Sequence, residues 1–154
     1  MSSPDDAGAQ SSNSIGAGMA RWLGYLGLIP FVAGGALALT GEPATRDVAL
    51  RAVIAYGAVI VSFLGGIHWG LALRAGANRA ARLLFVSVIP SLAGWLAVLL
   101  TPGTGLQVLI ATFVFVWFYE RATLWQSDFP AWFVRLRTHL TAVALIVLLA
   151  LSLA

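Results

Sequence analysis

The sequence predicts an all-α membrane protein, a polytopic bundle of five transmembrane helices. Hydrophobic residues make up 60% of the 154-residue chain and charged residues only 10%, whereas soluble domains are about 45–50% apolar. The mean hydropathy is +0.90. The apolar residues also fall into five long runs, each close to the roughly 20 residues that a helix needs to cross the hydrocarbon core of a bilayer.

The five runs define a membrane domain over residues 21–154, with spans expected at about 22–39, 52–73, 83–100, 106–122 and 136–154. Residues 1–20 combine Ser, Gly, Asn and Asp with almost no large apolar side chains. Such a segment cannot bury enough surface to offset the entropy of ordering, so we expect a disordered cytoplasmic tail. A cleavable signal peptide is the alternative, because Ala36 and Ala38 form an A-x-A pattern, but the leader lacks a basic start.

The first and third spans share a short pattern around a proline. The first contains IPFVAG at 29–34 and the third contains IPSLAG at 89–94. We expect helix kinks at Pro30 and Pro90, because each proline removes a backbone donor and crowds the preceding turn. A duplicated helical hairpin is one explanation of the match, and paired proline-interrupted spans can mark a transporter site. The other explanation is chance, because short segments built from a few apolar residue types match easily.

The second span is rich in small residues, and we expect it to be the central helix. In a membrane, small side chains let helix backbones approach closely. One stripe recurs every four residues, and Gly65 lies on roughly the opposite side, near His68. The predicted helix-packing residues are Ala58, Ser62, Gly65, Gly66 and Gly70.

The fourth and fifth spans carry charged residues toward their shared connection. A bare carboxylate at membrane depth costs several kcal/mol unless it is paired, protonated or hydrated, so we expect Glu120 to need a partner. The fifth helix is expected to start with Ser127 or Asp128 as its N-cap and Pro130 in its first turn. We predict a polar inner-leaflet cluster that draws on His68, Glu120, Arg135, Arg137 and His139. The alternatives are a solvated Glu120 at the headgroup boundary and a His68 that bonds only a neighbouring helix.

Arginine distribution predicts the orientation. Seven of the nine arginines lie in the N-terminal part or in the loops after the second and fourth spans, and only Arg46 and Arg51 lie on the other side. The positive-inside rule therefore places the N-terminus inside and the C-terminus outside.

Several classes of site are not expected. The chain has no cysteine, which removes disulfides, thiolate metal sites and iron–sulfur clusters. Haem held between His68 and His139 would need facing imidazoles, and we expect no metal and no cofactor. Its nine arginines form no basic tract, so nucleic-acid binding is not expected either.

Three stretches carry a resemblance to a known family. They are LGLIPF at 26–31, YGAVIVSFLGGIHWG at 56–70 and FPAWFVRLR at 129–137. Over roughly residues 21–145 the chain resembles the uncharacterised membrane-protein family typified by transmembrane protein 69, whose relatives occur in proteobacterial inner membranes and in mitochondria. The resemblance implies a small polytopic inner-membrane protein without an established reaction. It also implies that the position of His68 can carry Arg, which favours a hydrogen-bond donor or cation over an obligatory metal ligand.

The function that these observations favour is that of a non-enzymatic structural, accessory or assembly component of the bacterial inner membrane, in contact with the bilayer and with a protein partner in a larger complex. The alternative is a small transporter or proton-linked permease with a polar layer at His68 and Glu120. An enzyme that acts on lipids or quinones is a third class, but no recognisable nucleophile or metal set supports it.

Overall fold

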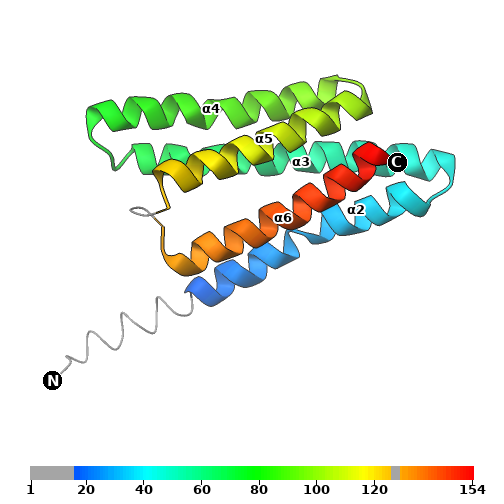
Figure 1. The fold of residues 1–154 in the computed structure, drawn as a ribbon, viewed down its shortest axis with the longest axis horizontal. Coiled ribbons are helices and arrows are strands. Elements are labelled where there is room, and N and C mark those ends of the chain that lie inside the picture. Colours follow the sequence, from blue (N-terminus) through cyan, green and yellow to red (C-terminus); the bar gives the residue numbers. More distant parts are fainter. Residues whose placement is uncertain (1–15, 126–128) are drawn as a thin grey trace.

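The computed structural model describes residues 16–125 and 129–154, which consist of helices joined by short turns. Five helical segments are long and apolar enough to cross a membrane. They run up and down the length of the molecule, so that the start of the first span and the C-terminus lie at opposite ends (Figure 1). The predicted all-α bundle of five membrane-spanning helices is confirmed.

The first span runs over Gly16–Thr40 and consists of two helical pieces. Residues 16–26 are helical, residues 27 and 28 form a turn, and α2 follows over Ile29–Thr40. Residues 16–20, which we expected in the tail, therefore belong to the helix, and residues 1–15 lie outside the described residues. The kink expected at Pro30 coincides with this interruption, because Pro30 is the second residue of α2.

Hydrogen bonds from side chains and from the backbone satisfy some of the backbone polar groups at the interruption of the first span. The Gly27 amide donates to the Leu23 carbonyl, and the Leu28 amide donates to the Tyr25 carbonyl, each at 3.0 Å. The hydroxyl of Tyr56, on the next span, donates to the Gly27 carbonyl at 2.8 Å. A carbonyl released by the interruption thus finds a partner inside the bundle, as backbone groups at membrane depth must.

The other four spans are uninterrupted helices: α3 over Pro43–Ala72, α4 over Ala77–Leu99, α5 over Pro102–Thr123 and α6 over Ala131–Leu153. Prolines open α3 and α5, where the missing amide hydrogen costs nothing. Pro90 lies inside α4 and is buried. Pro130 directly precedes α6, and the expected N-cap residues Ser127 and Asp128 lie outside the described residues.

The second span is longer than hydropathy indicates. We expected it to begin near residue 52, but α3 begins at Pro43 and has 30 residues. The first turns of α3 contain the charged residues Arg46, Asp47 and Arg51, which lower the hydropathy without ending the helix. Long charged side chains such as Arg can extend their charged ends to the membrane surface from within a helix.

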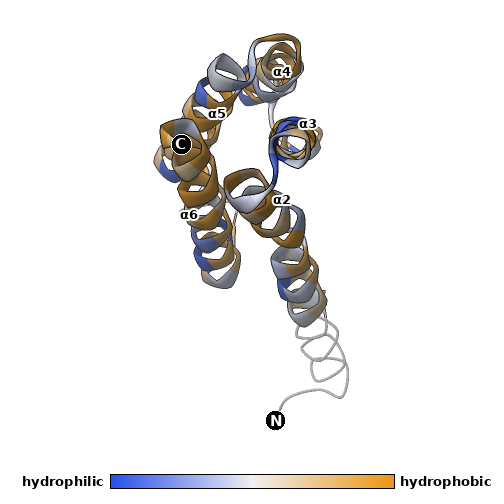
Figure 2. Ribbon diagram, turned by 90° about the vertical axis from the view of Figure 1, so that its right-hand side faces the viewer, coloured by the Kyte–Doolittle hydropathy of each residue, from blue (hydrophilic) through white to orange (hydrophobic). Residues whose placement is uncertain are grey.

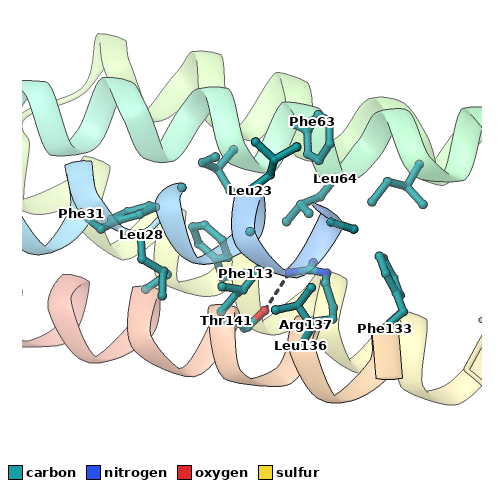
Figure 3. A pocket seen from close by; sticks show the side chains of 17 residues that line it. Leu23, Leu28, Phe31, Phe63, Leu64, Phe113, Phe133, Leu136, Arg137 and Thr141 are labelled. Carbon is teal, nitrogen blue, oxygen red and sulfur yellow. Dashed lines mark hydrogen bonds between the residues drawn. The ribbon is translucent and has the colours of Figure 1, made fainter. Parts of the chain in front are cut away.

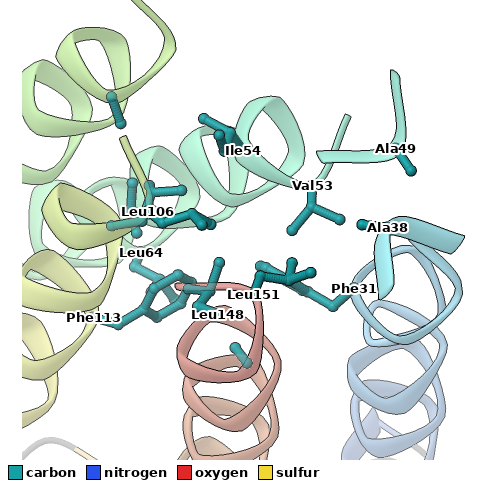
Figure 4. Close-up of a cluster of buried hydrophobic side chains, with 14 of the residues drawn as sticks. Phe31, Ala38, Ala49, Val53, Ile54, Leu64, Leu106, Phe113, Leu148 and Leu151 are labelled. Carbon is teal, nitrogen blue, oxygen red and sulfur yellow. The ribbon is translucent and has the colours of Figure 1, made fainter. Parts of the chain in front are cut away.

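α3 packs against α2, α4 and α5, which makes it the central helix. Figure 2 looks nearly along the bundle and shows α3 between α2 and α4, with α5 and α6 completing the assembly. The largest cluster of buried apolar side chains lies where α2, α3, α5 and α6 meet (Figure 4). Phe31, Phe113 and Leu148 are among its fully buried members.

The close helix contacts of α3 use only part of the small residues that we expected. A β-carbon at Gly65 would collide with the Ser87 carbonyl oxygen of α4, and one at Gly94 of α4 would lie 2.9 Å from the Ala58 carbonyl oxygen. Gly65 and Ala58 are thus at the crossing of α3 and α4, where backbones touch.

Gly66 and Gly70 contribute no such contact. A β-carbon at either position would have no heavy atom within 4 Å outside its own chain neighbours and helix backbone, and both residues are exposed. Ser62 is half-buried and donates its hydroxyl to the Ala58 carbonyl of its own helix at 2.8 Å. The expectation of a crossing at Gly66 and Gly70 is not met within the chain, because α3 turns this part of its surface outward.

Candidate functional site

Three of the five polar residues that we expected in one cluster meet inside the bundle. His68 of α3, Glu120 of α5 and Arg137 of α6 are 0%, 1% and 5% exposed. They meet because α3 and α5 end, and α6 begins, at the same end of the bundle (Figure 1). His68, Glu120 and Arg137 are called the buried triad below.

Glu120 is the central member of the buried triad. Arg137 donates a hydrogen bond from Nε to Glu120 Oε2 at 3.1 Å. The other carboxylate oxygen, Oε1, lies 3.5 Å from His68 Nε2. That approach lacks hydrogen-bond alignment, so Glu120 Oε1 and both ring nitrogens of His68 have no hydrogen-bond partner among the described residues.

Arg137 uses two of its three nitrogens within α5 and α6. Besides its bond to Glu120, it donates from Nη1 to the Thr141 hydroxyl at 2.7 Å, one helical turn further along α6. The third nitrogen, Nη2, is buried without a hydrogen-bond partner in the described part of the chain. The guanidinium is therefore held firmly on one side and has an unused donor on the other.

Helix rotation separates the remaining candidates from the buried triad. Arg135 and His139 are exposed, since each lies two residues from Arg137 and points roughly 200° around the helix from it. His139 Nδ1 lies 3.5 Å from the Tyr25 hydroxyl. Neither residue joins the cluster, and the two histidines have different neighbours.

Glu120 and its neighbour Arg121 also face different environments. Glu120 points inward, whereas Arg121 is exposed and its guanidinium carbon lies 5.9 Å and 5.8 Å from the ring centres of Trp117 and Trp125. Cation–π contacts of this kind suit a membrane boundary, where an indole and a guanidinium share the interface. Glu120 is therefore not the solvated boundary residue that we kept as an alternative.

Sequence reasoning missed two neighbours of the buried triad. Thr141 is Arg137's partner, and its spacing of four residues on the same helix was a usable signal. Tyr119 contacts His68 edge-on with ring centres 5.6 Å apart, and no sequence pattern marked it. The described residues contain no group of three or more His, Cys, Asp or Glu side chains placed to hold a metal ion.

A cavity of about 390 Å³ lies beside the buried triad, between the first span, α3, α5 and α6. Figure 3 shows Arg137 and its bond to Thr141 among otherwise apolar side chains. Leu23 and Phe63, which also line it, are 61% and 68% exposed. The cavity therefore reaches the lipid-facing surface between the first span and α3.

Comparison with known proteins places this chain in a family. A family model described as "Protein of unknown function (DUF3429)" matches residues 17–154. The chain belongs to this family. It is also 39% identical over 129 residues to transmembrane protein 69 of Xenopus tropicalis, a match that covers 81% of this chain and 50% of that protein.

The family membership confirms the expected resemblance and agrees with a multi-pass membrane protein. The chain spans about half the length of the curated relative that it matches. No solved structure matches the chain. The family description carries no biochemical activity.

Proposed function

We propose that this member of the DUF3429 family is a non-enzymatic component of the bacterial inner membrane, with a structural, accessory or assembly role in a larger membrane complex. The supporting observation is that the Glu120 carboxylate is bonded to Arg137 of another helix. This ion pair thus joins α5 to α6. One of the two carboxylate oxygens, Oε2, is therefore engaged in a contact between helices.

The energetics of buried ion pairs support a structural role. Removing one partner of such a pair costs about 3–5 kcal/mol, because the other charge stays buried without compensation. The buried triad ties α5 to α6 through a hydrogen-bonded ion pair and places α3 beside it. In a bilayer, where no hydrophobic force holds helices together, such a link specifies which helices are neighbours.

Affinity purification from native membranes tests the proposed role. We expect the full chain, extracted in mild detergent, to bring down another membrane protein in a fixed stoichiometry. Glu120→Leu should reduce the yield of that complex, and Thr112→Val is the matched control, because the Thr112 hydroxyl bonds only the Val108 carbonyl of its own helix. Recovery of the folded chain alone, in several mild detergents and after crosslinking in the membrane, would contradict the proposal.

A proton-linked permease is the second candidate, and one observation favours it. His68 Nε2 and Glu120 Oε1 lie 3.5 Å apart without a hydrogen bond, and such pairs inside membranes can relay protons. Proteoliposomes that contain the protein and a pH-sensitive dye should then show proton flux above that of empty vesicles. Glu120→Gln should abolish the flux while the protein stays folded; equal flux with and without protein contradicts this candidate.

We also propose that the N-terminus lies in the cytoplasm and the C-terminus outside, because the arginine-rich end of the bundle should face inward. The absence of cysteine makes this testable. Gly76 and Gly103 lie at opposite ends of the bundle, and a side chain at either would meet open space. In spheroplasts an impermeant maleimide should label Gly103→Cys and not Gly76→Cys; the reverse labelling would invert the topology.

A further inference from the structure

The cavity beside the buried triad combines an apolar wall with one unused hydrogen-bond donor. Of the residues that line it, all but Arg137 and Thr141 are apolar. Arg137 is 5% exposed, and its Nη2 has no hydrogen-bond partner in the described part of the chain. In Figure 3 its guanidinium points among the lining side chains. A buried donor in this position costs free energy until an acceptor meets it.

The chemistry of that acceptor can be narrowed. A guanidinium has donors and no acceptor, so the ligand must contribute an oxygen with a free lone pair. Water is a weaker candidate, because an ordered buried water typically makes about three hydrogen bonds, and only two polar side chains, Arg137 and Thr141, line the cavity. The guanidinium charge is already paired with Glu120, which favours an uncharged acceptor over a second full anion.

The volume of the cavity and the position of its opening narrow the class of ligand further. The volume of about 390 Å³ falls in the range of about 300–1,000 Å³ usual for small-molecule sites. Exposed Leu23 and Phe63 at its rim open it toward the bilayer, so the ligand enters from the lipid phase. Arg137 lies six residues from the start of α6 at Ala131, about 9 Å along the helix. The donor thus sits near one end of the bundle, where the polar end of a lipid chain would lie.

We propose that this cavity binds one lipid chain that carries a carbonyl oxygen at its head, with that oxygen accepting a hydrogen bond from Arg137 Nη2. The chain occupies the apolar space between the first span and α3. An acyl ester and a membrane quinone share this chemistry, a carbonyl on an apolar chain. This proposal does not depend on the assembly role proposed above.

Photocrosslinking tests the site on the full chain in nanodiscs. The probes are two phosphatidylcholines with a diazirine in the chain, one ester-linked and one ether-linked, which differ only in the carbonyl groups. We expect the ester probe to label cavity-lining residues about tenfold more than the ether probe, the ratio expected when a hydrogen bond to a charged donor is lost. Equal labelling by the two probes overturns the carbonyl contact without any change to Arg137.

A pair of matched variants tests the location. Ala20 lines the cavity, so Ala20→Phe should fill its rim and lower the ester-probe labelling at least fivefold. Ala55 is exposed on α3 and does not line the cavity, so Ala55→Phe should leave the labelling unchanged. Labelling spread evenly over the lipid-facing surface, or an equal effect of the two variants, overturns the site.

Competition then identifies the source of the carbonyl. Decylubiquinone should displace the ester probe from the cavity if the natural ligand is a quinone. If the ester probe resists decylubiquinone and is displaced by unlabelled diacyl phosphatidylcholine, the ligand is a glycerolipid chain. Failure of both competitors to displace the probe contradicts a specific site.

Discussion

Two adjacent glycines of α3 should respond to alanine in opposite ways. A β-carbon at Gly65 would overlap the Ser87 carbonyl oxygen, and this oxygen belongs to the backbone of α4 and cannot rotate away. A β-carbon at Gly66 would meet open space. Both positions lie in the interior of the same helix, so the two substitutions share the same change in helix propensity and differ only in packing.

The magnitudes follow from that difference. Gly→Ala within a helix gains about 0.8–1.0 kcal/mol of helix propensity, so Gly66→Ala should stabilise the protein slightly. Overpacking costs about 1–3 kcal/mol, and a backbone obstacle places Gly65→Ala at the upper end. We therefore expect the two variants to differ by about 2–3 kcal/mol. At about 2–4 °C per kcal/mol for a chain of this size, the melting temperatures should differ by about 4–12 °C.

Thermal unfolding in one detergent, followed by tryptophan fluorescence and by the loss of monodispersity, measures the difference. Wild type should lie between the two variants. Equal melting temperatures, or a Gly66→Ala protein less stable than Gly65→Ala, would refute the assignment of the inner and outer faces of α3.

Further predictions concern the buried triad. Glu120→Leu should destabilise the protein by about 3–5 kcal/mol in chemical unfolding, because it leaves the Arg137 cation buried alone, whereas Glu120→Gln keeps an acceptor oxygen and should cost less; equal losses would mean that the ion pair contributes little. His68→Arg should be tolerated better than His68→Leu in the same assay, because an arginine can donate to Glu120 Oε1, which has no hydrogen-bond partner among the described residues. A double-mutant cycle between His68 and Glu120 should give a coupling energy of about 0.5 kcal/mol or more, and a value of zero would make their 3.5 Å approach energetically irrelevant.

Hydropathy was sufficient to find the spans but not their ends. Each span is a long apolar run, and that property survives in any bundle. The start of α3 was placed nine residues late, at residue 52 instead of Pro43, because charged residues in its first turns lower the local hydropathy without ending the helix. The start of the first helix was likewise missed, because small residues such as Gly16 and Ala17 give a weak hydropathy signal.

The sequence indicated how far along the helices the site residues lie, but not which way each side chain faces around its helix axis. His68, Glu120 and Arg137 lie near the same end of the bundle, and the cost of isolated charges indicates that they should meet. Arg135 and His139 have the same depth and still face outward. Hydropathy carries little information about rotation in a membrane helix, since lipid and bundle interior are both apolar. For the same reason we expected Gly66 at a helix crossing, whereas it makes no close contact within the chain.

α3 contacts other helices at several points along its length, so these contacts depend on one helical register. Its contacts with α2 include Val53, whose Cγ2 would lie 2.6 Å from a β-carbon at Gly34 of α2. Further contacts follow at the crossing with α4, at His68 and at Ala72, which is buried with Leu83 and Leu124. Each residue inserted into a helix rotates the part of the helix that follows by about 100°. A single insertion after Ser62 would therefore keep the contact at Val53 and turn His68 away from Glu120. Insertions and deletions in α3 should therefore be tolerated only in multiples that restore a whole number of turns.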